Sequence, residues 1–153
     1  RSAPWAEVLG WAGVLSLGGL ALLWLFVLFR RAIGIGETPL LSQLLPETRA
    51  EKVVFVLLSF SAGVGEELAY RGFLIPALTL LLGWTWGAAL LSSAVFGLLH
   101  AYQGWLGMVR TAALGFVLAA SFILTGVLWP AILAHAILDV SAGVVLGEPW
   151  VKE

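Results

Sequence analysis

The fold is decided by one stretch of the chain, VVFVLLSFSAGVGEELAYRGFLIPALTLLL, which covers residues 53–82. Both ends of the stretch are apolar, and the whole is longer than the ~20 residues that a helix needs to cross a bilayer. Its middle nevertheless holds Glu66, Glu67 and Arg71. An ionisable side chain inside a membrane costs about 2.5–3.5 kcal/mol and usually faces the interior of a helix bundle. The stretch therefore predicts a membrane helix whose polar face is turned toward other helices.

The composition of the chain agrees with a membrane setting. Hydrophobic residues make up 61% of the 153 residues and charged residues 11%, whereas an average soluble domain is about 25% charged. Four further apolar stretches occupy residues 8–29, 84–100, 107–128 and 130–146. We therefore expect an all-α fold, a single polytopic transmembrane bundle over residues 1–153 with about five spans. Such a protein is an integral, multi-pass membrane protein whose partner is the lipid bilayer.

Charge and cysteine content exclude several classes of function. The formal net charge is -1, and no basic patch is present of the kind that nucleic acid requires, so nucleic acid is not an expected partner. The chain has no cysteine. Disulfides, a thiolate nucleophile and cysteine-bound zinc are therefore excluded together.

The two neighbouring glutamates of the opening stretch are predicted to have different tasks. Side chains four residues apart share one face of a helix, so Glu67 pairs with Arg71. Glu66 points about 100° away around the helix, and the residue four positions after it is Tyr70. One carboxylate is therefore expected to be satisfied structurally, and the other is left for chemistry.

Both histidines of the chain lie in or at the ends of apolar stretches. His135 and Asp139 are four residues apart and share a helix face, and Phe96 and His100 have the same spacing. A single membrane histidine is more typical of an interhelical hydrogen bond than of catalysis. Two histidines, an unpaired glutamate and an aspartate on three separate stretches favour a functional site.

These residues resemble the motifs of a known family. EELAYR (residues 66–71) fits Glu-Glu-x-x-x-Arg, FGLLH (96–100) fits Phe-x-x-x-His, and HAILD (135–139) fits His-x-x-x-Asn/Asp. In this order they resemble the CPBP family of intramembrane glutamate-dependent proteases, which includes the CAAX proteases and the bacteriocin-processing Abi proteins. The resemblance implies a catalytic core over residues 53–146, no cofactor, and a place in a bacterial or archaeal cell membrane. It also implies an endopeptidase that acts near the C-terminus of a prenylated or membrane-associated peptide or protein substrate.

The resemblance also assigns roles to individual residues. Glu66 would be the base that activates water and His100 would hold that water, while His135 and Asp139 would stabilise the oxyanion. Glu67 and Arg71 would be a supporting pair. Independently of the resemblance, Tyr70, Phe96 and Asp139 each lie one helical turn from a candidate catalytic residue, so they are expected to line or support the same cavity. The third motif ends in Asp139, where the eukaryotic and archaeal prenyl-protein proteases usually have Asn. Because a carboxylate donates a hydrogen bond only when it is protonated, orienting His135 is an alternative role for Asp139.

Other functions use the same residues. Glu66, His100, His135 and Asp139 form a set of two nitrogen and two oxygen ligands that suits zinc, although the chain lacks His-Glu-x-x-His, and our expectation is that no metal is bound. Ser92, Ser93 and Ser121 stand outside any nucleophile motif. A non-catalytic membrane scaffold or peptide-binding protein is the main alternative to a protease. A proton-coupled carrier is a third reading, which the small number of spans and the lack of an inverted repeat disfavour.

The sequence leaves one geometric conflict. If every span were a straight helix, His100 would lie near one end of its span and His135 near the opposite end of its own. A shared site then requires a tilted, broken or re-entrant element. The best candidate is the segment of residues 72–83, which contains Pro76.

Overall fold

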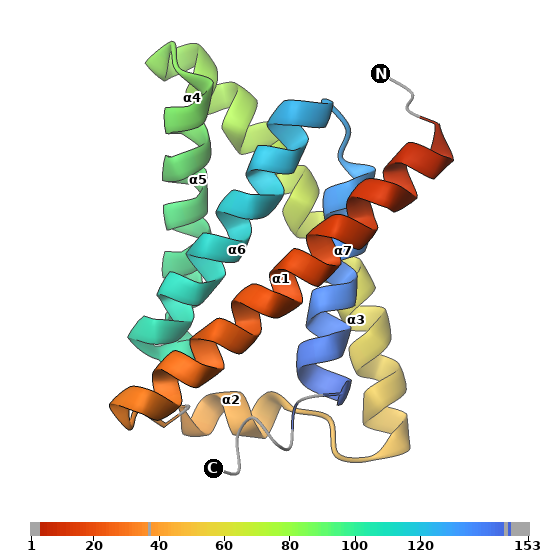
Figure 1. The fold of residues 1–153 in the computed structure, drawn as a ribbon, viewed down its shortest axis with the longest axis vertical. Helices are drawn as coiled ribbons and strands as arrows, with labels where there is room; N and C mark the ends of the chain where they lie inside the picture. The colour runs from red at the N-terminus through yellow and green to blue at the C-terminus, as the bar shows by residue number, and fades with distance from the viewer. Residues whose placement is uncertain (1–3, 37, 146, 148–153) are drawn as a thin grey trace.

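The structure is a computed structural model that describes residues 4–36, 38–145 and 147, and within these residues it is helical without a strand (Figure 1). The expected all-α fold is confirmed. The last residue of the predicted core, Leu146, lies outside the described residues. In chain order the helices are α1 (Trp5–Ile33), α2 (Pro39–Leu44), α3 (Arg49–Glu67), the π-helical turn η1 (Leu68–Leu74), α4 (Ile75–Leu82), α5 (Thr85–Leu99), the short 3-10 turn η2 (Ala101–Gln103), α6 (Gly104–Thr125), α7 (Trp129–Val140) and the π-helical turn η3 (Ser141–Val145).

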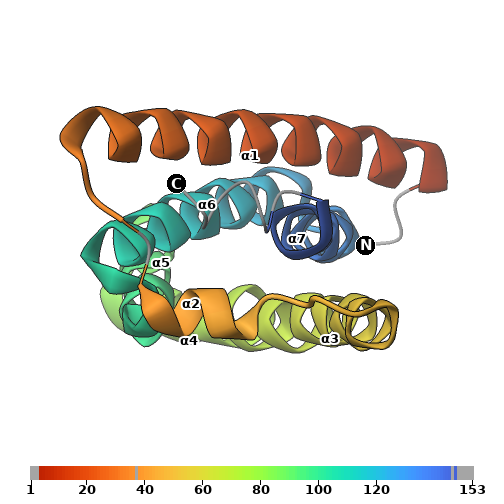
Figure 2. The same cartoon turned by 90° about the horizontal axis from the view of Figure 1, so that it is seen from below.

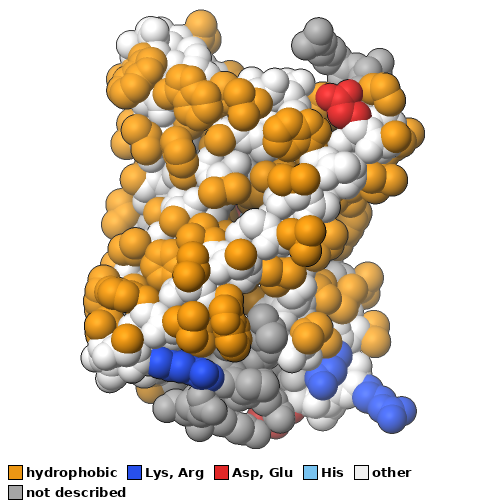
Figure 3. Space-filling view, in the orientation of Figure 1, with side chains coloured by type: hydrophobic (Ala, Val, Ile, Leu, Met, Phe, Trp, Pro, Cys, Tyr) orange, Lys and Arg blue, Asp and Glu red, His pale blue; other side chains and the backbone are white. Residues whose placement is uncertain are grey.

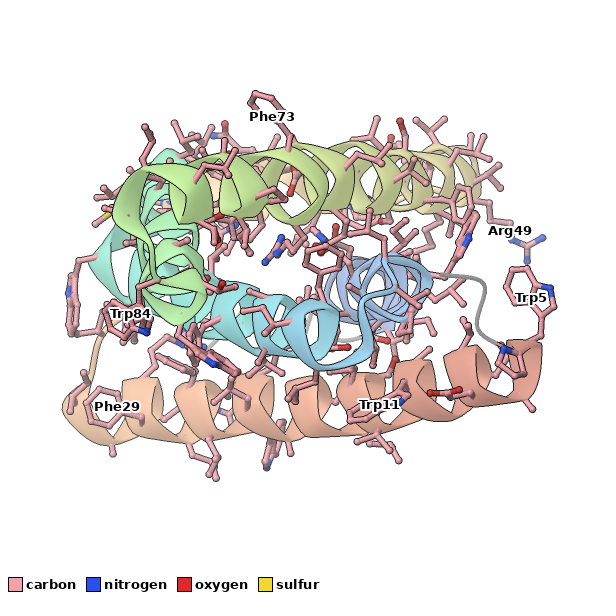
Figure 4. The ribbon with its side chains drawn as sticks, turned by 90° about the horizontal axis from the view of Figure 1, so that it is seen from above. Trp5, Trp11, Phe29, Arg49, Phe73 and Trp84 are labelled. Atoms are coloured by element: carbon pink, nitrogen blue, oxygen red, sulfur yellow. The ribbon has the colours of Figure 1, made fainter. Side chains whose placement is uncertain are left out.

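Helix length and surface chemistry identify a membrane protein. Helices spanning Trp5–Ile33, Arg49–Leu82 and Ala101–Thr125 are long and apolar enough to cross a bilayer, and the apolar helices Thr85–Leu99 and Trp129–Val145 are shorter. Hydrophobic side chains cover most of the face in Figure 3, and the Lys and Arg side chains visible there lie near its lower end. Figure 4 shows Phe73 pointing away from the bundle, and this side chain is 71% exposed. Extensive exposed apolar surface of this kind is typical of a protein that lies in lipid.

The helices are arranged in layers. Seen from below, α1 covers one side, and α6 and α7 lie between it and the layer that holds α3 and α4 (Figure 2). Helix α5 packs against both α4 and α6, and α7 packs against both α1 and α3. Helix α7 is therefore an inner helix, which explains why its residues are among the best buried in the chain.

Local signals in the sequence set the ends of the helices. Helix α3 begins with a capping box, in which the Glu51 backbone N–H donates to Thr48 Oγ1 and the Thr48 backbone N–H donates to Glu51 Oε2. Helices α4 and α6 end at Gly83 and Gly126, with φ of 66° and 69°. This left-handed conformation favours glycine, and it lets the chain reverse into α5 and α7.

A glycine allows α3 and α7 to approach closely. A Cβ atom on Gly63 would lie 3.0 Å from the Ile132 carbonyl oxygen and 3.3 Å from the Ala136 nitrogen. Any larger side chain would separate the two helices. Because Gly63 is one turn before Glu66 and Glu67, this close approach brings both carboxylates to α7.

The helix expected to break at residues 72–83 remains continuous. The chain stays helical from Arg49 to Leu82, and it widens into a π-helical turn before Pro76, where the Ile75 N–H donates to the Tyr70 carbonyl five residues earlier. A proline ring lacks the N–H and crowds the carbonyl four residues before it. The wider turn gives the ring room without ending the helix.

The conflict over the depth of the histidines is resolved differently. His135 lies at the middle of α7, which is short, and so is not near the end of its helix as a set of straight spans would require. His100 is the residue that follows α5. Helix α3 also runs obliquely to α5 (Figure 1), and Glu66, near the end of α3, lines the same cavity as His100 and His135. His100 and His135 thus reach one site because the helices are inclined to one another, and no helix has to be broken.

Candidate active site

A cavity of about 380 Å³ lies among α3, α5, α6 and α7, and residues of α2 also line it. Most of the lining is apolar, with side chains such as Leu58, Leu114 and Leu138. The titratable side chains among the lining residues are Glu66, His100, Tyr102, Arg110, His135 and Asp139. The structure thus brings the four predicted catalytic residues to one cavity, although they come from three helices.

His135 is the centre of the polar contacts. Its Nδ1 lies 2.8 Å from Glu67 Oε1, and its Nε2 lies 3.6 Å from Glu66 Oε2 and 3.6 Å from Asp139 Oδ2. A carboxylate oxygen accepts, so Nδ1 carries the hydrogen that it donates to Glu67. This bond fixes the ring and turns Nε2 toward the cavity, between two carboxyl groups.

Glu67 belongs to a buried layer behind the cavity. Its side chain has no exposed surface, and the expected pair with Arg71 is present, since Arg71 Nη1 donates to Glu67 Oε1 over 2.8 Å. Arg71 Nη2 donates to the Gly115 carbonyl over 2.7 Å. A Cβ atom on Gly115 would lie 3.1 Å from that nitrogen, so a glycine is needed where the guanidinium reaches α6. A buried charge is tolerated only when it is paired in this way.

The contact between Glu67 and His135 is the feature that sequence reasoning missed. The pair with Arg71 follows from helical spacing, but His135 is 68 residues away along the chain. No local pattern indicates which of two neighbouring glutamates will meet it. Glu67 is therefore more than a structural partner of Arg71, because it also holds an imidazole of the cavity.

Aromatic rings position the second imidazole. His100 Nδ1 lies 2.7 Å from the Phe96 carbonyl oxygen, so Nδ1 donates and Nε2 is an acceptor. The ring of Phe96 lies between its neighbours, with centroid distances of 4.7 Å to His100, 6.0 Å to His135 and 4.9 Å to Tyr70. Phe96 and Asp139 line the cavity, as expected. Tyr70 is not among the lining residues, and it supports Phe96 from behind through an edge-on contact.

A second polar group lines the cavity away from the motifs. Arg110 Nη2 donates to Gln103 Oε1 over 2.9 Å, and Thr111 Oγ1 donates to the same oxygen over 3.4 Å. Gln103 and Thr111 were not predicted as site residues. They belong to none of the motifs, and only the turn η2 brings Gln103 next to α6.

The alternative zinc site gains no geometric support. Among the described residues, no three His, Asp or Glu side chains are grouped so that they would hold a metal ion. His135 already uses Nδ1 for Glu67, which leaves Nε2 to face two carboxyl groups at 3.6 Å. Zinc ligands converge at about 2.0–2.2 Å from the ion with a nearly tetrahedral arrangement.

The fold and the cavity define a class: a helical membrane protein with carboxylate and imidazole side chains around one pocket inside the bundle. The model of a family described as type II CAAX prenyl endopeptidase, Rce1-like, matches residues 48–141. This match covers more than half of the chain, so the protein belongs to this family of CAAX-type intramembrane proteases, and the resemblance found in the motifs is confirmed. The matched segment begins at the N-cap of α3, ends just after α7 and contains all three motifs. No curated protein and no solved structure matches the chain.

Proposed function

We propose that the protein is an intramembrane endopeptidase that hydrolyses a peptide bond with a water molecule activated by Glu66. The observation that carries the proposal is the position of Glu66 Oε2, 3.6 Å from His135 Nε2 at the wall of a cavity that His100 also lines. A base, a water site and hydrogen-bonding groups for the carbonyl oxygen are what amide hydrolysis requires. Residues 53–146 would form the catalytic core.

Glu66 is suited to the role of base by its place on the helix. Its side chain is 36% exposed, whereas that of Glu67 is fully buried and bound to Arg71 and His135. Glu66 would therefore reach a water molecule that enters the cavity. His100 presents Nε2 as an acceptor, because Nδ1 is used by the Phe96 carbonyl, and it would hold the second hydrogen of that water. Attack by the water oxygen would leave the former carbonyl oxygen to be stabilised by His135 and Asp139.

The membrane setting and the family give the substrate class. The cavity is lined mainly by apolar side chains of helices that face lipid, so the substrate would be a peptide or protein segment in or at the membrane. The family description names prenyl endopeptidases of CAAX sequences. A prenylated or membrane-associated chain that is cut near its C-terminus is therefore the substrate that we propose.

The proposal is tested with the full chain in detergent or lipid nanodiscs and an internally quenched, farnesylated CAAX-type peptide. Wild type should release the C-terminal fragment, as mass spectrometry would show. Glu66→Gln keeps the shape and removes the base, so it should lose activity, while Glu7→Gln, which changes an exposed carboxylate of α1, should remain active. Binding of the peptide without cleavage by wild type would instead support a peptide-binding scaffold. The unprenylated peptide shows whether the lipid is required.

A further inference from the structure

Two carboxyl groups flank the same nitrogen in the cavity. Glu66 Oε2 and Asp139 Oδ2 each lie 3.6 Å from His135 Nε2, so the two oxygens are separated by no more than twice that distance. Their side chains are 36% and 40% exposed, and both line the cavity. A substrate carbonyl that lies against Nε2 is therefore within reach of two carboxyl groups from different helices.

The polar groups around His135 Nε2 can share a proton. His135 Nδ1 donates a hydrogen bond to Glu67, so a neutral ring offers a lone pair at Nε2. Two ionised carboxylates around that lone pair would bring acceptors together without a donor.

Several other titratable side chains surround the group formed by Glu66, His135 and Asp139. Behind it, Glu67 is neutralised by Arg71. Across the cavity are the remaining titratable side chains of the lining: His100 from α5, Tyr102 from η2 and Arg110 from α6. Since the proposed function needs Glu66 as an ionised base, the carboxyl group left to hold the proton is that of Asp139.

We infer that Asp139 is a catalytic acid, which donates its proton to the carbonyl oxygen of the substrate while Glu66 removes a proton from the attacking water. This inference rests on the proposed function. The water oxygen bonds to the carbonyl carbon, and the intermediate is a neutral gem-diol. Protonated Glu66 then gives its proton to the amide nitrogen, the C–N bond breaks, and Asp139 recovers a proton from one hydroxyl of the gem-diol. The products are a carboxylic acid and an amine, and both carboxyl groups return to their starting states.

This role differs from the two roles that the sequence suggested for Asp139. A donor to an oxyanion, or a group that orients His135, needs only a hydrogen bond. An asparagine supplies such a bond but has no transferable proton. Asp139→Asn therefore separates proton transfer from hydrogen bonding in one substitution of nearly equal size.

The test compares Asp139→Asn, Asp139→Glu and Asp139→Ala with wild type, using the same farnesylated CAAX-type peptide. We expect kcat of Asp139→Asn to fall about 10²-fold or more, with Asp139→Ala reduced as strongly. Asp139→Glu, which keeps a transferable proton, should retain more activity than Asp139→Asn. In wild type, kcat/KM should fall at high pH as the acid loses its proton, and this alkaline decrease should be absent or displaced in Asp139→Asn. Thermal unfolding in the same detergent identifies any variant that fails to fold.

The possible outcomes are distinct. Activity of Asp139→Asn equal to or above wild type would overturn the inference and favour a hydrogen-bonding role. A low activity of Asp139→Asn with an unchanged alkaline decrease would also overturn it. If wild type cleaves no peptide while Glu7→Gln and wild type fold alike, the proposed function itself fails, and the inference fails with it. Loss of activity in Glu66→Gln together with full activity in Asp139→Asn would keep the proposed function and reject the acid.

Discussion

Two neighbouring regions of the molecule use the same residue types for opposite purposes. The cavity wall, formed by Glu66, His100 and Asp139, holds side chains that are partly exposed to the cavity. The buried layer behind it, formed by Glu67, Arg71 and the carbonyl of Gly115, is closed by hydrogen bonds of 2.7–2.8 Å. Glu66 and Glu67 are adjacent in the chain, so a rotation of about 100° around the helix separates them. His135 lies between the regions, with one nitrogen in each.

The two regions therefore depend on each other: the buried layer holds His135 in place, and the cavity wall supplies the side chains that can react. The cavity wall can contact a substrate because its side chains line the cavity, and those of Glu66 and Asp139 are partly exposed. The buried layer fixes the ring of His135 and so fixes the geometry of the wall. We therefore expect substitutions in the wall to reduce catalysis without loss of stability, and substitutions in the layer to reduce stability first.

Glu66→Gln should have the largest effect and tests the wall directly. Loss of the base should lower kcat by about 10²–10⁴-fold, with the midpoint of thermal unfolding unchanged. The measurement is hydrolysis of the farnesylated CAAX-type peptide together with unfolding in detergent, with Glu7→Gln as the control. A fall in the unfolding midpoint equal to that of Glu67→Gln would remove the division between wall and layer.

Glu67→Gln tests whether the buried layer stabilises the fold. It leaves the Arg71 guanidinium buried without its carboxylate, which typically costs about 3–5 kcal/mol. A lower free energy of unfolding is therefore expected, along with reduced activity, because His135 loses the acceptor at Nδ1. The double variant Glu67→Gln/Arg71→Gln should be less destabilised than the sum of the single variants, since the two residues form one pair. Additive effects would show that they are not coupled.

Gly63→Ala tests the distance between the wall and His135. The new methyl group would lie 3.0 Å from the Ile132 carbonyl oxygen, so α3 and α7 must move apart, with an expected loss of about 1–3 kcal/mol and a drop in kcat. Gly10→Ala is the matched control, because nothing lies within 4 Å of its added Cβ. It should be neutral or stabilising by up to about 1 kcal/mol, since alanine favours the helix. Equal results for both variants would contradict the close approach.

Substitutions at Tyr70 should have the smallest effect, and they test whether this residue belongs to the site. Tyr70→Phe keeps the edge-on contact with Phe96, so stability and activity should change little. Tyr70→Leu removes the ring pair and should cost about 0.5–1.5 kcal/mol. Unfolding in detergent measures both. A large loss of activity in Tyr70→Phe would mean that the phenol takes part in the reaction, and the wall would then have to include it.

Much of the site was predictable because its motifs lie on helices. Spacing of four residues predicts the Glu67–Arg71 pair and places His135 near Asp139 and Phe96 near His100, and all three pairings are present. The polar lining by Gln103 and Thr111 was not predictable, because neither residue stands in a pattern with the others. Nor could the sequence predict the continuous helix at Pro76, since a proline is compatible with either a break or a wider turn.

The sequence alone determined that this protein lies in a membrane and that it is built from helices. A chain with 61% hydrophobic residues in stretches of 17 to 30 residues must satisfy its backbone within helices in a membrane. It also determined which residues share a helix face, because that follows from 3.6 residues per turn. Only the tertiary structure decided that Glu67, rather than Glu66, binds His135 Nδ1, and that Nε2 then faces Glu66 and Asp139. The reason is that contacts between α3 and α7 depend on how closely and at what inclination two helices pack, and no local spacing encodes these quantities.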